Sequence, residues 1–167
     1  MDPTRQAPPL KGRQLHFVDV DNLTGGATEN LRSHIALRQF YDGYTNRQEC
    51  DLVFVACCHY SGFAVATAWQ GVKIYWRSGK NGADEALLQA FEEANLDGVT
   101  RVWVASGDGI FIPVLEALRA GTHGDGRIES AVIALDRSVV HQTIPTVAGS
   151  VFTLADSRPI SPFDRAG

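Results

Sequence analysis

The sequence predicts one α/β domain with three layers, in which helices cover both faces of a mostly parallel central sheet. Short apolar runs alternate with helix-like stretches along the chain. This alternation is typical of strand–helix–strand units, whose right-handed crossovers place helices on both faces of a doubly wound sheet. The length of 167 residues suits a single domain, and 44% hydrophobic with 20% charged residues is typical of a globular protein with a core.

The first half of the chain contains three expected strands. Residues 14–20 (QLHFVDV) form the first, and a helix is expected at 29–42. Residues 52–57 (LVFVAC) are almost continuously apolar, as a strand buried on both faces requires. A short helix is expected at 61–69, and a third strand at 72–77 (VKIYWR).

The second half repeats the pattern. Residues 83–95 give the clearest helix, because alanine, leucine and phenylalanine form one apolar stripe along it. A strand at 101–105 (RVWVA) precedes a helix at 111–120. Two further short strands are expected at 130–135 and 151–154, which completes a sheet of parallel units.

The two ends of the sequence differ from the middle. Residues 1–13 and 157–167 are rich in proline and show no periodicity, so we expect flexible tails on either side of a domain at 14–156. The N-terminal stretch lacks the apolar segment of a signal peptide, and no run of about 18 apolar residues predicts a membrane span. The three cysteines lack C-x-x-C spacing, which argues against a disulfide framework or a zinc site. A cytoplasmic protein is the expectation, either a monomer or a homo-oligomer.

Three aspartates follow strands or begin helices where ligands bind such sheets. Asp19 ends the first strand, Asp84 begins the helix at 83–95, and Asp108 follows the strand at 101–105. Carboxyl ends of parallel strands meet at one edge, and ligands bind there near the change in strand order. An aspartate before a helix is usually only a cap, but a carboxylate after a buried strand needs a partner or a metal.

Several carboxylates at close range repel one another, and a hard divalent cation such as Mg²⁺ relieves that repulsion. The chemistry expected of such a centre is hydrolysis of a phosphodiester or phosphate ester. Asp21 and Glu85 are possible supporting carboxylates. Lys80, Arg77 and Arg137 are the candidate contacts for substrate phosphate. The formal net charge of −4 neither favours nor excludes a nucleic-acid partner.

Three motifs resemble the NYN-domain nucleases of the PIN-like superfamily. They are FVDVDNL at 17–23, GADEAL at 82–87 and SGDGIFIPVLEAL at 106–118, and the resemblance covers roughly residues 15–156. It implies a PIN-like (Rossmannoid) fold and cleavage of single-stranded or structured RNA that depends on Mg²⁺ or Mn²⁺. It places Asp19, Asp84 and Asp108 as metal ligands, within a catalytic group that also contains Asn22 and Ser106. The positions that match the family pattern are Asp19, Asn22, Asp84, Ser106, Asp108 and Phe111.

One position departs from the family pattern, because Ile110 replaces the second aspartate of the third motif. An Ile110→Asp change is therefore expected to strengthen metal binding. The departure also motivates an alternative, an RNA-binding or interaction module with a degenerate metal site. A second alternative is a haloacid-dehalogenase-like phosphatase, since the two aspartates of FVDVDNL resemble the first motif of that class. Leu23 fits that motif poorly, and the Gly-Ala-Asp at 82–84 has no role in it.

Overall fold

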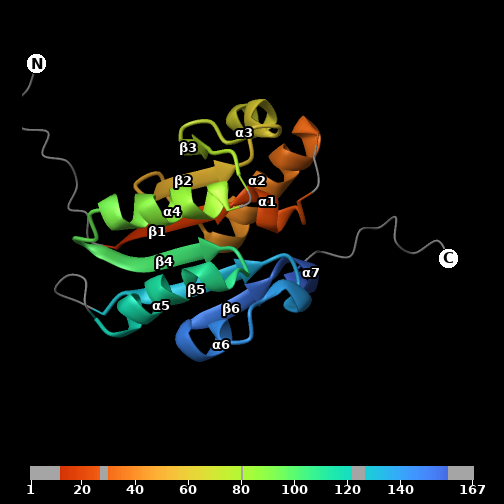
Figure 1. Ribbon diagram of the computed structural model, residues 1–167. Coiled ribbons are helices and arrows are strands. Elements are labelled where there is room, and N and C mark those ends of the chain that lie inside the picture. The colour runs from red at the N-terminus through yellow and green to blue at the C-terminus, as the bar shows by residue number, and fades with distance from the viewer. Residues whose placement is uncertain (1–11, 27–29, 80, 122–126, 158–167) are drawn as a thin grey trace, which may run out of the picture.

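Six parallel strands form the centre of the protein, in the order β3-β2-β1-β4-β5-β6 (Figure 1). The computed structural model describes residues 12–26, 30–79, 81–121 and 127–157. The predicted α/β fold is confirmed, and the sheet is entirely parallel. Its strands are β1 (Arg13–Asp19), β2 (Leu52–Cys57), β3 (Lys73–Trp76), β4 (Val99–Ala105), β5 (Glu129–Ala134) and β6 (Ser150–Thr153).

Helices cover both faces of this sheet, so the three-layer arrangement is also confirmed. In Figure 1, α4 and α5 cross the near face, while α2 and α3 lie on the other side. The helices are α1 (Val20–Leu23), α2 (Leu31–Thr45), α3 (Gly62–Ala68), α4 (Gly82–Glu93), α5 (Ile112–Arg119), α6 (Ile144–Val147) and α7 (Leu154–Ser157), with short 3₁₀ turns η1 (Gly109–Phe111) and η2 (Arg137–Val139). None of the helices in the described ranges is both long and apolar enough to cross a membrane.

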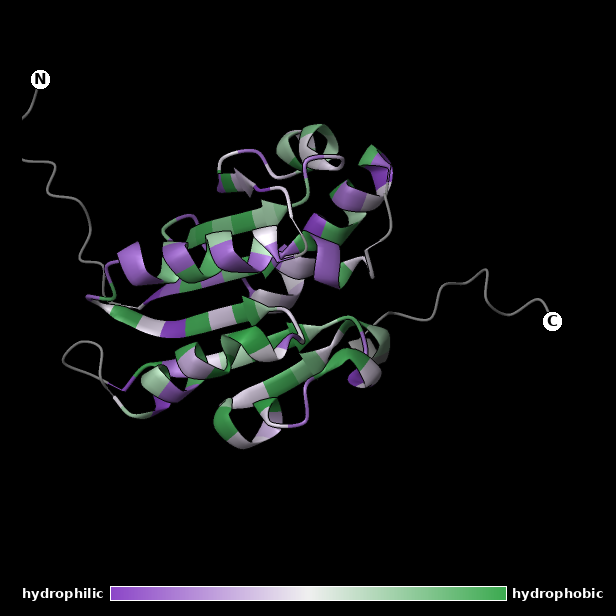
Figure 2. Cartoon of the chain, in the orientation of Figure 1, coloured by the Kyte–Doolittle hydropathy of each residue, from purple (hydrophilic) through white to green (hydrophobic). Residues whose placement is uncertain are grey.

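The alternation of side chains along β1 divides the core into two parts. Leu15 and Phe17 face α4, where the ring of Phe17 packs edge-on against Phe91 with centroids 5.5 Å apart. Val18 faces the other way, into the cluster beneath α2 and α3. In Figure 2 much of the sheet is coloured as hydrophobic, while α4 in front of it carries many hydrophilic residues. The same alternation turns Asp19 toward α4.

Several predicted boundaries were wrong by a few residues. The expected strand at 14–20 ends at Asp19, because the Asp19 side chain accepts a hydrogen bond from the Asn22 amide and so caps α1. The helix expected at 29–42 spans Leu31–Thr45, with Asn30 as its cap. Arg13, assigned to the N-terminal tail, begins β1 and donates to the Asn95 carbonyl at 2.9 Å. The rest of that tail lies outside the described residues except Gly12, and so does the C-terminal tail beyond α7.

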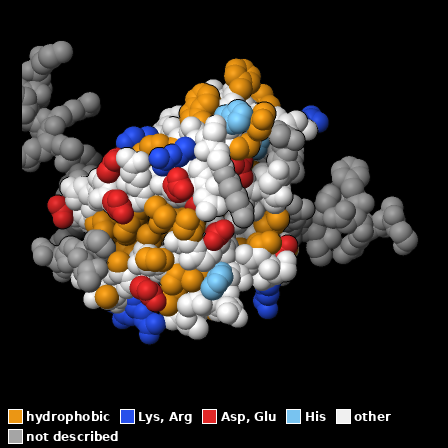
Figure 3. Space-filling view, viewed as in Figure 1, with side chains coloured by type: hydrophobic (Ala, Val, Ile, Leu, Met, Phe, Trp, Pro, Cys, Tyr) orange, Lys and Arg blue, Asp and Glu red, His pale blue; other side chains and the backbone are white. Residues whose placement is uncertain are grey.

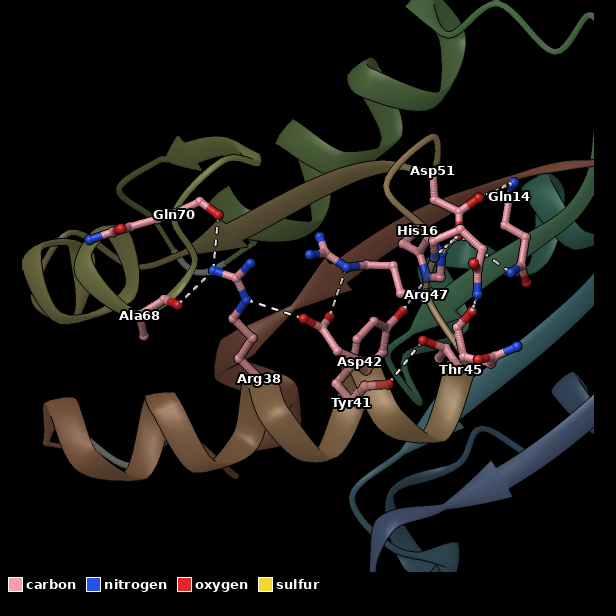
Figure 4. A network of polar contacts seen from close by, with 12 residues as sticks. Gln14, His16, Arg38, Tyr41, Asp42, Thr45, Arg47, Asp51, Ala68 and Gln70 are labelled. Carbon is pink, nitrogen blue, oxygen red and sulfur yellow. Dashed lines mark hydrogen bonds and ion pairs between the residues drawn. The ribbon is translucent and has the colours of Figure 1, made fainter. Parts of the chain in front are cut away.

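A buried polar network joins the amino-terminal half of β1 to α2 and to the turn before β2 (Figure 4). His16 is fully buried, and its Nδ1 lies 3.0 Å from the Tyr41 hydroxyl. Asp51 accepts the backbone N–H of Gln14 and of Gln48, each at 2.7 Å. Burial lowers the pKa of His16, and its Nε2 lies 3.6 Å from the Asp51 carboxylate, too far for a hydrogen bond. We therefore treat His16 as neutral, so that the Asp51 contacts with backbone amides carry the network.

Candidate active site

The candidate site lies where the strand order changes direction. From β1 the chain builds outward through β2 and β3, then returns to place β4 on the other side of β1. The carboxyl ends of β1 and β4 therefore mark the switch point of the sheet, which is where ligands bind in doubly wound folds. Asp19 ends β1, and Ser106 follows β4 directly. The structure thus brings the first and third sequence motifs to this edge.

Asp19 is a buried acid. Only 4% of the residue is exposed, and one carboxylate oxygen accepts the Asn22 amide at 3.1 Å. Burial raises the pKa of Asp19 from the ordinary value of 3.8 to about 8, and the nearby Asp84 carboxyl adds to the rise. The hydrogen bond from Asn22 opposes it. Near neutral pH the Asp19 carboxyl is therefore mostly protonated.

Asp84 is the facing partner of Asp19. It is the third residue of α4, and burial raises the pKa of its carboxyl, as do the charges of Asp108 and Asp21. The contact with Asp19 acts in the opposite direction, because a protonated Asp19 donates a hydrogen bond to Asp84. Asp84 Oδ1 is buried and has no other donor among the described residues. A buried carboxyl and a half-buried one that share a proton can exchange that proton for a cation.

Glycine positions Asp84 at the start of α4. A Cβ atom on Gly82 would lie 2.5 Å from the carbonyl oxygen of Arg77, so only glycine allows the chain after β3 to pack this closely against the helix. Asp84 and Glu85 both lie in the first turn of α4, where the helix dipole favours negative charge. The second motif therefore fixes the Asp84 carboxyl through backbone contact.

Asp108 lies at the rim of the site. It is exposed, and its Oδ1 accepts the Ile110 amide at 3.0 Å, which caps η1. The negative charge of Asp108 raises the pKa of the Asp84 carboxyl. Among the described residues no three His, Cys, Asp or Glu side chains are placed to hold one metal ion together. The structure thus joins Asp19 and Asp84 directly, with Asp108 as an electrostatic neighbour.

Asn22 and Ser106 hold the two loops of the site to one another. The Asn22 side-chain oxygen accepts the backbone N–H of Gly107 at 3.0 Å, so the turn after β1 is bonded to the turn after β4. Ser106 is fully buried, and its hydroxyl accepts the Asp108 amide at 3.2 Å. Both residues were predicted to be part of a catalytic group. Their contacts make them positioning residues, because each fixes a backbone segment that carries an aspartate.

The segment between β5 and α6 also borders the site, which sequence reasoning missed. The His141 amide donates to the Gly107 carbonyl at 2.8 Å, and the Val139 carbonyl packs against Gly107 so closely that no Cβ fits there. The His141 ring lies against Gly109, where a Cβ would come within 2.7 Å of it. Gly107 and Gly109, on either side of Asp108, indicate that another segment packs closely against this turn. The sequence alone does not identify this segment as the neighbour.

The predicted supporting carboxylates have other partners. Asp21 accepts the Cys58 amide at 2.6 Å, which ties α1 to the end of β2. Its charge nevertheless raises the pKa of both Asp19 and Asp84. Glu85 is exposed and lies 3.9 Å from Arg77, a long surface ion pair. Asp21 therefore contributes charge to the site from one side, while Glu85 is turned toward solvent.

Two of the three predicted phosphate-binding cations, Arg77 and Arg137, follow the carboxyl ends of β3 and β5. Arg77 follows β3 directly, and its backbone contacts the start of α4. Arg137 is exposed after β5 and borders a hollow of about 510 Å³ beside β6. Lys80 lies outside the described residues. Arg77 is thus the described cation most directly connected to the segment that carries Asp84.

Ile110 is half-buried and packs against the hydrophobic core beneath α4 and α5. We therefore expect Ile110→Asp to lower the free energy of unfolding by about 1–3 kcal/mol, because a charged group replaces apolar contacts. This expectation differs from the gain in metal binding that the motif alone predicts. Urea unfolding and Mn²⁺ titration of Ile110→Asp, with Ile110→Asn as the uncharged control, distinguish the two. A stable Asp variant that binds Mn²⁺ more tightly than both others would mean that position 110 faces the metal.

No family model matches this sequence, and no curated protein matches it either. Asp19 and Asp84, which we call the acid pair, place two carboxyl groups at the switch point of the sheet. The pKa of Asp19 is raised, and Asp84 Oδ1 is buried without an N–H donor among the described residues. Such a pair suits general acid–base chemistry or coordination of a hard divalent cation.

Proposed function

We propose that the chain is a metal-dependent ribonuclease that hydrolyses phosphodiester bonds of RNA at the Asp19–Asp84 pair. The observation that carries the proposal is that the buried carboxyl of Asp19 faces the half-buried carboxyl of Asp84 at the carboxyl edge of the sheet, where burial raises the pKa of Asp19 to about 8. A protein that only needed a helix cap at Asp19 would gain nothing from placing a second carboxyl against it. The strand order, with β1 beside β4, is the one in which ligands bind at this place.

Each residue has a defined part in the proposal. Asp19 and Asp84 would hold Mg²⁺ or Mn²⁺, and Asp108 at the rim would add its negative charge to the site. A bound divalent ion neutralises the phosphate charge and supplies an activated water. Asn22 and Ser106 keep the two aspartate-bearing loops in register. Arg77, Lys80 and Arg137 are the proposed contacts for RNA phosphates.

The test is cleavage of a labelled RNA by wild type and Asp84→Asn, with Mn²⁺, with Mg²⁺ and with EDTA. We expect cleavage by wild type in either metal, none in EDTA, and a loss of about 100-fold or more in Asp84→Asn, since even outer-shell changes cost 10–100-fold. Asp97→Asn, an exposed position in the turn before β4, is the matched control and should keep full activity. Equal metal-dependent cleavage by Asp84→Asn would rule out this site as the source of the activity.

A second candidate function is RNA binding without cleavage. It is favoured by the hydrogen bond that holds the Asp108 carboxylate to the Ile110 amide, and by the lack of a group of three ligands in the described ranges. In the same assay this candidate predicts retention of RNA with no product in any metal. Release of phosphate from a phosphomonoester, with RNA left intact, would instead support the phosphatase alternative.

A cytoplasmic location belongs to the same proposal. The three cysteines are free thiols, of which Cys50 is exposed, Cys57 buried and Cys58 half-buried. Exposed and unpaired thiols are typical of proteins kept in a reducing compartment. RNA is available as a substrate in that compartment.

A further inference from the structure

Three aromatic side chains stand out from the surface beside the candidate site. Tyr60 is 78% exposed, Phe63 is 82% exposed and Trp76 is 57% exposed. Tyr60 and Phe63 come just after β2, and Trp76 is the last residue of β3, so all three lie at the carboxyl edge that also carries Asp19. Figure 3 shows hydrophobic side chains grouped around a histidine at the end of the molecule where α3 and β3 lie. We call Tyr60, Phe63 and Trp76 the aromatic platform.

The aromatic platform is held in place by its neighbours. The Trp76 ring lies against Gly62, where a Cβ would come within 2.7 Å of the ring, so only glycine admits it. The ring of Tyr60 lies 4.0 Å from that of His59, measured between centroids. His59 in turn is bonded through Nδ1 to the Ser78 hydroxyl at 3.1 Å. These contacts orient aromatic rings that would otherwise fold back onto apolar surface.

Backbone contacts connect the platform to the acid pair on two sides. Arg77 follows Trp76 directly, and its carbonyl packs against Gly82, two residues before Asp84. On the other side, the backbone amide of Cys58, two residues before Tyr60, donates a hydrogen bond to the Asp21 carboxylate of α1. The platform and the acid pair are therefore carried by segments that contact one another at the same edge of the sheet.

We propose that the aromatic platform stacks unpaired bases of the RNA substrate, which makes the site selective for single-stranded RNA. The proposal rests on the ribonuclease function proposed above. Exposed aromatic faces bind bases of any sequence, and bases are accessible for stacking only when they are unpaired. Arg77 supplies the positive charge that a phosphate between two stacked bases requires, in a protein whose formal net charge is −4. A duplex hides its bases and presents no face to the platform.

Tryptophan fluorescence reports on the platform directly. The chain has three tryptophans, of which Trp69 is fully buried and Trp103 is 4% exposed, so Trp76 is the one accessible to solvent. EDTA prevents metal-dependent cleavage. In its presence we expect a 12-nucleotide oligoadenylate to quench the Trp76 emission and to protect Trp76 from further quenching by acrylamide. The same oligonucleotide paired with its complement should do neither. The change should be absent in Trp76→Phe, which keeps an aromatic ring and removes the signal.

Affinity gives the second measurement, by anisotropy of a labelled oligoadenylate in EDTA. We expect Phe63→Ala and Trp76→Ala each to weaken binding by about 5- to 100-fold, the range reported for loss of one stacked base. Trp76→Phe should bind nearly as wild type does. Phe63 is so exposed that its replacement leaves the fold unchanged. Ile35→Ala, an exposed apolar position on α2, is the matched control and should have no effect.

The outcomes separate this inference from the proposed function. Unchanged affinity in both alanine variants, or equal affinity for the duplex, would overturn the platform even if wild type cleaves RNA. Weakened binding in a protein that never cleaves RNA would keep the platform and refute the nuclease. A dimer of wild type that Trp76→Ala converts to a monomer, with RNA affinity unaltered, would mean that the platform is an interface between two copies of the chain.

Discussion

We expect Asp19→Asn to abolish metal-dependent RNA cleavage and, in the absence of metal, to make the protein more stable at pH 8. Replacing Asp19 removes a ligand, so cleavage should fall by about 100-fold or more. The amide removes the cost of burying a negative charge against Asp84 while keeping an oxygen for the Asn22 amide. It also gains an N–H that can donate to Asp84. Loss of activity with gain of stability is typical of a residue kept for function.

The pKa of Asp19 determines the pH at which this gain appears. The folded protein holds the proton up to about pH 8, whereas the unfolded chain releases it near 3.8. Stability from the neutral carboxyl is thus fully present below pH 3.8 and is lost as the pH rises toward 8. Asp19→Asn does not lose stability in this way. The difference in free energy of unfolding between the variant and wild type therefore grows from nearly nothing at pH 4 to several kcal/mol at pH 8, at roughly 1.4 kcal/mol per pH unit.

Urea unfolding of wild type and Asp19→Asn in EDTA, from pH 4 to pH 9, measures the difference. Added Mn²⁺ should then stabilise wild type at pH 8 and leave the variant unchanged, because the ion binds the ionised pair. Asp97→Asn serves again as the exposed control. Parallel stability curves for wild type and Asp19→Asn would show that Asp19 does not titrate as a buried acid, and the acid pair would lose its main support.

The largest loss of stability is expected far from the site, in Asp51→Ala. The Asp51 side chain is almost fully buried and accepts the amides of Gln14 and Gln48. Burial would raise the pKa of this carboxyl, but the hydrogen bonds from the two backbone amides outweigh burial and lower it. Alanine leaves two partly buried N–H groups without their acceptor, at about 1–3 kcal/mol each, so the free energy of unfolding should fall by about 2–6 kcal/mol.

Asp51→Asn separates the hydrogen bonds from the charge. One amide oxygen can still accept a backbone N–H, so we expect a smaller loss, with RNA cleavage unaffected in folded protein. Because the folded pKa of Asp51 is lowered, its stabilisation is present above the ordinary pKa of 3.8 and is lost as the pH falls through the lower folded value. A change below about 0.5 kcal/mol in Asp51→Ala, as at ordinary surface positions, would mean that water replaces the carboxylate.

The sheet could be predicted because its strands carry strong local signals. The run at 52–57 is apolar almost throughout, and β2 occupies the same residues. The short helices α1, α6 and α7 could not be predicted, since four residues carry no helical period. The end of β1 was misplaced by one residue for a related reason. Val20 is a good strand residue, and only the capping bond from Asn22 to Asp19 turns the chain into α1.

The candidate site was predictable in part. The motifs placed Asp19, Asp84 and Asp108 at one edge, as parallel topology requires. What the motifs could not give was the depth of each residue. Asp19 is buried while Asp108 is exposed, a difference that depends on how α4 and η1 pack on the sheet. The packing of His141 against Gly109 joins residues of distant segments, and a single sequence contains no signal for it.

The position of β1 at the centre of the sheet has a consequence for how the protein is made. Leu15 pairs with Leu52 on one side and with Val102 on the other. A ribosome releases β1 first and β4 only after β2, β3 and α4 have emerged. During that interval the edge of β1 that pairs with β4 has no partner strand, and unpaired strand edges can pair with other chains. The time that translation takes between β1 and β4 therefore sets how long the nascent chain is exposed to aggregation.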